Sequence, residues 1–336
     1  MATVGIIANP ASGKDIRRIV SGARVVSHQE KANIISRFMA GLNAEGDHEI
    51  LLMPDGSGLS RKIEDAGKDW RFPPKLIELN GVSGTWKDTL ASVEHMVQND
   101  VSVIVTLGGD GTNRIVSKAC GKVPLIPIST GTNNVFPQMI EGTLAGLAAG
   151  RVASLGEAAH SVCKRAPMFE IVNGQGVVVD NALIDIAVVR SGIRGALAVW
   201  QVEDIYSALV TRARSDVIGL SAIAGAVAPN GQATRVMLGK GGRKVRAAIA
   251  PALVPELPIE DVQEIVEGAA VPLGPPGAML AFDGEREMRV EAGKPLFARL
   301  TRQGPWVVDI AAALSGTSSA DENKNLPTEE FCHGTK

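Results

Sequence analysis

The segment Val101–Leu107 constrains the fold of this chain most strongly. It is a run of mostly β-branched residues that does not alternate between polar and apolar positions. Such a run is typical of a strand buried on both faces, as in a parallel sheet covered by helices. The glycine-rich stretch Gly108–Thr112 follows at once, and Ile115, Val116 and Ala119 then recur at helical spacing. A strand, a tight loop and a helix in this order predict one unit of an α/β sheet.

The rest of the first half repeats this alternation. Strands are expected at residues 4–8, 49–53, 75–79 and 123–128, and helices at 30–42 and 85–97. Strands that alternate with helices favour a doubly wound, mostly parallel sheet. We therefore predict an α/β nucleotide-binding domain over residues 1–150.

The second half has a different texture. Short apolar runs come in pairs, and turn signals such as Asn173-Gly174 and Asp283-Gly284 separate them. One helix is expected at Gln201–Arg214. This pattern predicts a β-rich sandwich domain over residues 155–312, which would hold the substrate, and then a polar, flexible tail over 315–336.

Composition excludes several classes of protein. Lysine plus arginine number 34 and aspartate plus glutamate 36, and aromatic residues make up 4% of the chain. This balance argues against a nucleic-acid-binding protein, which needs a basic surface or aromatic stacking platforms. No apolar run reaches the ~18 residues of a membrane span. The 3 cysteines are too scattered for a disulfide framework or a zinc site. We expect a cytoplasmic protein whose partners are small molecules.

The loop Gly108–Thr112 is the sharpest candidate site. Its glycines let backbone N–H groups turn toward one point, and the helix behind it adds a positive dipole, so Gly108, Gly109 and Gly111 would cradle a phosphate. Asp110 would repel a bare phosphate, but it fits a role as a Mg²⁺ ligand or as a base for an attacking hydroxyl. The alternative is a glycine turn with an aspartate cap.

Two more loops follow predicted strands. The first, after residues 4–8, contains a tight turn and a cation that suit a triphosphate, and the second, after 123–128, is rich in hydroxyl and amide groups. The alternatives are a surface turn with solvated cations and a polar loop that caps a helix. With Thr112, the predicted nucleotide-binding residues here are Asn9, Ser12, Gly13, Lys14, Thr130, Gly131, Thr132, Asn133 and Asn134.

A fourth candidate lies in the second domain, at Phe282–Glu287. Asp283 and Glu285 could direct two carboxylates at a metal ion or at the attacking hydroxyl. Asp-Gly is also a preferred hairpin pair, so a simple turn explains the same residues.

Together these motifs resemble the superfamily that joins NAD kinases with diacylglycerol and sphingosine lipid kinases. The resemblance is carried by Gly-Gly-Asp-Gly-Thr at 108–112, Asn-Pro-x-Ser-Gly at 9–13 and Asp-Gly-Glu at 283–285. Within the superfamily, Pro127–Pro137 and Gly219–Gly225 are similar to the acetoin-catabolism protein X branch, which is ATP-NAD kinase-like. The resemblance implies an NAD kinase-like fold with ATP and substrate in a cleft between the two domains.

The resemblance also implies a chemistry. The protein would be an ATP-dependent kinase that phosphorylates a hydroxyl of NAD or of another small soluble substrate, with a possible link to acetoin catabolism. Asp110, Asp283 and Glu285 would be catalytic, Asp110 and Asp283 would hold Mg²⁺, and Asp185 would reach the nucleotide or substrate from the second domain. A homo-oligomer, dimer or tetramer, is expected.

One stretch departs from the NAD kinase pattern. In Asn181–Asp185, Ile184 stands where NAD kinases carry an asparagine, and Asp185 stands where they carry a glutamate. The alternative function is therefore a nucleotide- or dinucleotide-binding regulator without catalysis.

Overall fold

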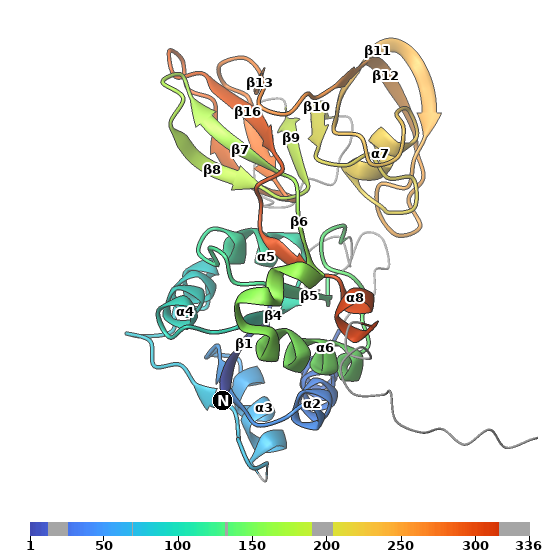
Figure 1. Ribbon diagram of the computed structural model, residues 1–336. Helices are drawn as coiled ribbons and strands as arrows, with labels where there is room; N and C mark the ends of the chain where they lie inside the picture. The colour runs from blue at the N-terminus through green and yellow to red at the C-terminus, as the bar shows by residue number, and fades with distance from the viewer. Residues whose placement is uncertain (13–25, 69, 132–133, 190–203, 316–336) are drawn as a thin grey trace, which may run out of the picture.

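The computed structural model describes the chain except residues 13–25, 69, 132–133, 190–203 and 316–336, and it leaves out the side chains of 240 and 285–287. The first three residues of the predicted Gln201–Arg214 helix lie outside the described residues. The predicted tail over 315–336 lies outside them except for its first residue. Figure 1 shows two parts, an α/β part with helices around a sheet and a β-rich part stacked on it. The predicted fold class is confirmed.

The sheet of the α/β part has the strand order β3-β2-β1-β4-β5-β17-β6. The first five of these strands pair in parallel. They are β1 (Ala2–Ala8), β2 (His48–Leu52), β3 (Lys75–Leu76), β4 (Val103–Gly108) and β5 (Leu125–Ser129). The chain order reverses between β1 and β4, and open α/β sheets bind ligands at such a switch point, beyond the carboxyl ends of the strands.

Helices cover this sheet. Three fall where the sequence predicts them, namely α2 (His28–Ala44), α4 (Trp86–Gln98) and α5 (Asp110–Ser117). Two were not predicted, α3 (Leu59–Gly67) and α6 (Gly142–Leu155). Helix α6 is rich in glycine and alanine, and it packs so closely on α2 that a Cβ at Gly146 would collide with the backbone of Phe38. Because α6 packs on α2 through glycine and alanine, it lacks the large apolar residues at helical spacing by which a helix is predicted from a sequence.

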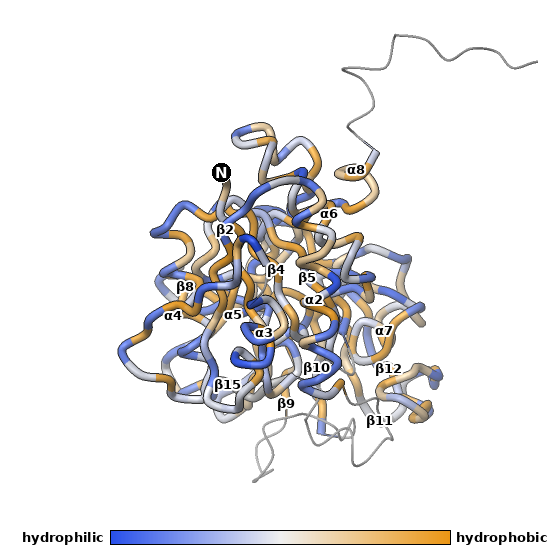
Figure 2. The backbone as a smooth tube through the Cα atoms, turned by 90° about the horizontal axis from the view of Figure 1, so that it is seen from below, coloured by the Kyte–Doolittle hydropathy of each residue, from blue (hydrophilic) through white to orange (hydrophobic). Residues whose placement is uncertain are grey.

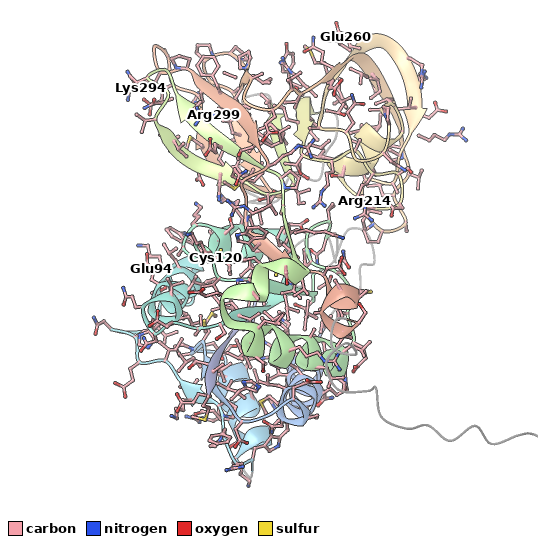
Figure 3. The ribbon with its side chains drawn as sticks, in the orientation of Figure 1. Glu94, Cys120, Arg214, Glu260, Lys294 and Arg299 are labelled. Carbon is pink, nitrogen blue, oxygen red and sulfur yellow. The ribbon has the colours of Figure 1, made fainter. Side chains whose placement is uncertain are left out.

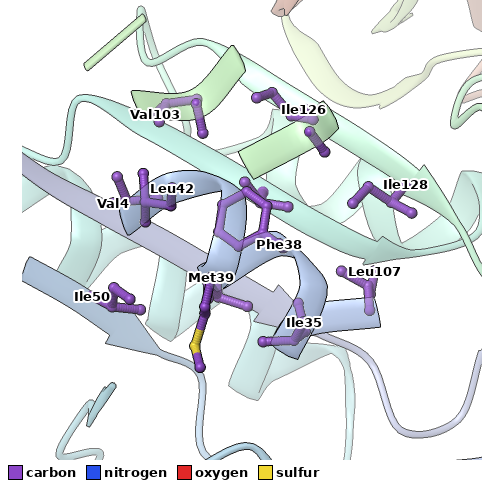
Figure 4. Close-up of a cluster of buried hydrophobic side chains, with 14 of the residues drawn as sticks. Val4, Ile35, Phe38, Met39, Leu42, Ile50, Val103, Leu107, Ile126 and Ile128 are labelled. Atoms are coloured by element: carbon purple, nitrogen blue, oxygen red, sulfur yellow. The ribbon is translucent and has the colours of Figure 1, made fainter. Parts of the chain in front are cut away.

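The α/β core lies between the sheet and α2. Val4 and Ile50 from the strands meet Ile35, Phe38 and Leu42 from the helix, and all five side chains are fully buried (Figure 4). In Figure 2 hydrophobic stretches gather toward the centre of the molecule, and its periphery mixes hydrophilic and hydrophobic stretches. Burial of this apolar surface is the main stabilising contribution to the α/β part.

The β-rich part contains two antiparallel sheets, with strand orders β12-β11-β10-β9-β14-β15 and β13-β16-β7-β8. The first sheet consists of β9 (Asp185–Val189), β10 (Ile205–Val210), β11 (Thr234–Arg246), β12 (Glu256–Glu264), β14 (Met279–Phe282) and β15 (Glu285–Arg289), with α7 (Leu220–Gly225) packed on it. The second consists of β7 (Met168–Asn173), β8 (Val178–Ala182), β13 (Ala270–Pro272) and β16 (Leu296–Thr301).

Two features differ from the sequence prediction. Residues 205–210, placed in a helix by the sequence, form strand β10, which pairs with both β9 and β11. The last strand, β17 (Trp306–Val308), pairs with β5 and with β6 (Cys163–Arg165), so it completes the sheet of the α/β part. Helix α8 (Ile310–Ser315) then packs on α6, and the short 3-10 helix over Gly156–Val162 precedes β6. No helix within the described ranges has both the length and the hydrophobicity to cross a bilayer.

Candidate functional site

The loops that follow β1, β4 and β5 are tied together at the carboxyl edge of the sheet. Asn9 Nδ2, after β1, donates to Thr112 Oγ1 at 2.8 Å, at the start of α5. The Ser12 and Thr130 hydroxyls lie 2.8 Å apart and join the loops after β1 and β5. Thr130 is fully buried. The structure thus brings four of the predicted nucleotide-binding residues into one network.

Asp110, the first residue of α5, binds the turn that follows β5. Its carboxylate accepts a hydrogen bond from Phe136 N at 2.8 Å and two from Val135 N, one to each oxygen, at 3.1 Å. The side chain therefore shapes the turn after β5 from the first residue of α5. The Gly109 position before it offers no side-chain cap, whereas α2, α4 and α6 are capped by Ser27, Thr85 and Glu141.

Lys31 is a site residue that the sequence analysis missed. Its ammonium group is buried and donates to the backbone oxygens of Asn9 at 2.8 Å, Pro10 at 3.3 Å and Ser12 at 3.0 Å. A signal was present, because Lys31 shares the apolar helical face of Ile35. A lysine on a buried face must be paired, and here it holds the loop after β1.

Replacement of Lys31 by methionine is expected to destabilise the protein by about 3 kcal/mol or more. Hydrogen bonds to a charged group contribute ~1.5–3 kcal/mol each, and the variant leaves buried carbonyl groups without their donor. Chemical denaturation measures the change. Lys62→Met is the control, because the Lys62 ammonium lies at the surface, 3.4 Å from Gln29 Oε1. Equal stability of Lys31→Met and the wild type would contradict the anchoring role.

Gly108 leaves no space for a side chain unless Thr112 moves, and a side chain at Gly109 would require a shift of the Asn134 amide. A Cβ at Gly108 would lie 2.5 Å from Thr112 Cβ, and one at Gly109 would lie 2.9 Å from Asn134 Oδ1. The loop is held further by Asn113, which is fully buried, accepts from Thr106 Oγ1 at 2.7 Å and donates to Gly109 O at 2.9 Å. The backbone here is therefore fixed from several sides.

Gly108→Ala is expected to lower nucleotide affinity at least tenfold. The new methyl group displaces Thr112 and with it the hydrogen bond from Asn9, and overpacking of this kind costs ~1–3 kcal/mol. Calorimetric titration with Mg–ATP measures the affinity. Gly56→Ala is the matched control, because a Cβ at Gly56 meets nothing within 4 Å. Unchanged affinity in a folded Gly108→Ala protein would mean that the loop has no part in binding.

Asp283 occupies a different environment from the one that a metal ligand needs. Its carboxylate accepts from the N–H groups of Leu183 at 2.9 Å, Ile184 at 2.7 Å and Asp185 at 3.1 Å, and the side chain is completely buried. Burial raises the pKa of Asp283, while Arg114 and the three N–H groups act in the opposite direction. These are the contacts of a carboxylate that holds the turn between β8 and β9.

Arg114 joins the two parts of the protein at this point. It lies one helical turn after Asp110 and is 2% exposed. Its Nη1 donates to Asp180 Oδ1 at 2.9 Å and to Asn181 O at 3.2 Å, and its Nε lies 4.0 Å from Asp283 Oδ2. The guanidinium also stacks on the Phe282 ring, 5.5 Å from its centroid. Asp283 therefore contacts α5, the helix that begins at Asp110, through the guanidinium of Arg114.

The other site residues predicted from the sequence lie at the edges of these loops or outside the described residues. Asp185 is half-buried at the start of β9, Gly131 and Asn134 lie in the turn after β5, and Gly111 lies in the first turn of α5. Gly13, Lys14, Thr132 and Asn133 are outside the described residues, and so is the side chain of Glu285, which begins β15.

The described carboxylates do not form a metal site by themselves. Among the described residues no group of three or more His, Cys, Asp or Glu side chains could hold a metal ion. The Asp283 oxygens face three N–H donors and a guanidinium, so they do not fit Mg²⁺, which needs accessible oxygen ligands. The predicted pairing of Asp110 with Asp283 around one ion has no support in this geometry.

Comparison with known proteins places the chain in a family. A family model described as the ATP-NAD kinase N-terminal domain matches residues 4–152, and one described as the Acetoin catabolism protein X C-terminal domain matches residues 167–303. The Acetoin catabolism protein X of Cupriavidus necator is 32% identical over 340 residues, which cover 96% of this chain and 94% of that protein. The crystal structure of yeast NADH kinase complexed with NADH matches 97% of this chain and 90% of that chain, with a TM-score of 0.48 and 16% identity. On the sequence matches, the chain belongs to the acetoin catabolism protein X family, with an N-terminal domain of the ATP-NAD kinase type.

Proposed function

We propose that this protein is an ATP-dependent phosphotransferase with an alcohol group as acceptor. The observation that carries the proposal is the position of Asp110. This carboxylate stands at the start of α5, where no side chain caps the helix and where the loops after β1, β4 and β5 meet. An N–H-rich helix start beside a fixed carboxylate suits phosphoryl transfer, which depends on positioning and on charge stabilisation.

In this proposal the first turn of α5 binds the ATP phosphates. Backbone N–H groups of the Gly108–Thr112 loop and the positive end of the helix dipole favour anions there. Gly13 and Lys14 would complete the triphosphate site, and Thr132 and Asn133 would contact the nucleoside. Mg²⁺ would enter with ATP as the Mg–ATP substrate, because this ion usually binds through substrate phosphates and water.

Asp110 acts as the general base. The acceptor hydroxyl oxygen attacks the γ-phosphorus, the bond from that phosphorus to the β–γ bridging oxygen breaks, ADP leaves, and the hydroxyl proton passes to Asp110. Hydrogen bonds from Val135 N and Phe136 N hold the carboxylate in place for this step. Glu285 is retained as a candidate catalytic residue. We assign Asp283 a positioning role, since it fixes the turn that leads to Asp185.

The acceptor is proposed to be a small soluble compound other than NAD. Ile184 is 1% exposed and packs in an apolar cluster with Val135 and Phe136. An apolar side chain here cannot make the polar contact that the NAD kinase asparagine would supply. The name of the Cupriavidus relative links that protein to acetoin catabolism, and we propose the same metabolic setting for this chain. The cytoplasmic location and the homo-oligomeric state stay predictions.

A second candidate function is a nucleotide-binding regulator without catalysis. The specific observation in its favour is the use of Asp283 for structure, together with the absence of a carboxylate cluster among the described residues. Such a protein would bind ATP at the same loops without transferring its phosphate.

Incubation with γ-labelled ATP, Mg²⁺ and pools of small hydroxyl compounds separates these candidates. The kinase proposal expects a labelled product that requires an acceptor and is lost in Asp110→Asn. Binding of Mg–ATP by calorimetry without labelled product from any pool would favour the regulator. Failure of the wild-type protein to bind Mg–ATP would contradict both.

A further inference from the structure

A cavity of about 770 Å³ lies between the two parts of the protein, beside the turn that Asp110 holds. From the α/β part it is lined by the turn after β5, the start of α6, strand β17 and helix α8, and from the β-rich part by the residues that follow β10. Its apolar wall includes Val135, Phe136, Ile140, Leu144, Val307 and Ile310. A cavity of this size suits a small organic molecule.

The charged residues of the wall are mostly cations, and two of them have carboxylate partners. Lys164 contacts Asp309 at 2.6 Å, and Arg214 contacts the exposed Asp216 at 2.6 Å. Figure 3 shows Arg214 on the side of the β-rich part that faces the α/β part. These two cations are therefore neutralised within the protein.

The other two cations of the wall lack a carboxylate partner within the described part of the chain. Arg165 donates to the Gln303 side-chain oxygen at 2.8 Å and stacks on Trp306. The side chain of Arg212 is half-buried and makes no hydrogen bond to any described residue, and its Nε is buried without a partner. Burial of a charge without a partner is costly, and such a residue is typically kept where a ligand supplies the partner.

The electrostatic surroundings of Arg212 agree with this interpretation. Burial and the charge of Arg214 lower the pKa of Arg212, and the charge of Asp110 raises it. A guanidinium nonetheless stays charged at neutral pH. Arg212 is thus a half-buried cation with a buried Nε, in electrostatic reach of Asp110, and it lines this cavity.

We propose that Arg212 binds an oxyanion, carboxylate or phosphate, of the acceptor substrate, whose apolar body lies in this cavity. A guanidinium presents parallel N–H donors that match both groups. The inference rests on the proposed phosphotransferase function and narrows its acceptor to hydroxyl compounds that carry a negative charge. Arg212 would orient the acceptor so that its hydroxyl reaches Asp110.

Matched pairs of probes test the inference by calorimetry, without any turnover. The carboxylate pair is 3-hydroxybutyrate and 1,3-butanediol, and the phosphate pair is glycerol 3-phosphate and glycerol. We expect at least one anion to bind at least tenfold more tightly than its uncharged counterpart, and the two arms show which anion the site prefers. Arg212→Gln should weaken that anion at least tenfold, and Arg299→Gln, in the β7–β16 sheet, should leave it unchanged.

Stability of the ligand-free protein gives a second readout. Because Arg212 is half-buried and its Nε has no partner among the described residues, Arg212→Gln should raise the melting temperature by about 2 °C. If the role of Arg212 were purely structural, the melting temperature of Arg212→Gln would fall below that of the wild type. Weak binding by both anions, or equal binding to wild type and Arg212→Gln, would overturn the inference. Mg–ATP titration of the same variant keeps the two proposals separate, because ATP binding should persist when the acceptor site fails.

Discussion

Asp110→Asn is expected to lower phosphoryl transfer by ~100-fold to ~10,000-fold while Mg–ATP binding persists. A general base contributes ~10²–10⁴-fold to rate, and asparagine cannot accept the proton. The amide also loses acceptor capacity toward Val135 N and Phe136 N, which both bind the carboxylate. The turn after β5 should therefore loosen as well, so the acceptor KM should rise along with the fall in kcat.

Asp88→Asn is the matched control for this substitution. Asp88 is another buried aspartate at the start of a helix, and its carboxylate accepts from Ser83 N at 2.8 Å and Gly84 N at 2.7 Å. It lies in α4, so its loss should reduce stability without changing kcat. Turnover of Asp110→Asn at the wild-type rate would show that Asp110 is not the base.

Arg114→Met is expected to be the most destabilising substitution, by about 3–5 kcal/mol. Removal of one partner from a buried ion pair leaves the other charge uncompensated. Here the completely buried Asp283 loses a cation, Asp180 keeps its pair with Lys118 at 2.7 Å, and the contact between α5 and the β8–β9 turn is broken. The midpoint of chemical denaturation measures this. Arg299→Met, which removes a more exposed pair with Glu170, should cost less than ~1 kcal/mol.

The loss of stability in Arg114→Met should also depend on pH. Arg114 lowers the pKa of Asp283 against the effect of burial, so its removal raises the folded-state pKa further above that of the unfolded chain. The folded variant then holds a proton that the unfolded chain has released, and its stability increases as pH falls. The difference from wild type should shrink between pH 8 and pH 5. A difference that stays constant over this range would mean that Asp283 is not the group left uncompensated.

The α/β part could be predicted from the sequence because its signals are local. The apolar run before Gly108 and the helical spacing after it each report burial directly, and the loops then follow from parallel topology. Helix α6 was missed because Gly142 and Gly146 pack by close approach instead of by large apolar side chains. The short run Ile205–Val210 is compatible with both the helical and the strand periodicity, and only its pairing with β9 and β11 makes it strand β10.

The sequence predicts which residues form the site better than it predicts what each of them does. Asn9, Ser12, Thr112 and Thr130 do meet, since strand ends bring them to one edge of the sheet. The role of Asp283 depends on N–H groups a hundred residues away in the chain, at Leu183 and Ile184. No sequence pattern encodes such a contact.

The most direct test of the central claim is a calorimetric titration of Mg–ATP into the wild-type protein and Gly108→Ala, followed by product analysis with γ-labelled ATP and an anionic hydroxyl acceptor. We expect saturable binding to the wild type, binding at least tenfold weaker to Gly108→Ala, and a phosphorylated acceptor that Asp110→Asn does not form. Absence of Mg–ATP binding by the folded wild-type protein would contradict the central claim.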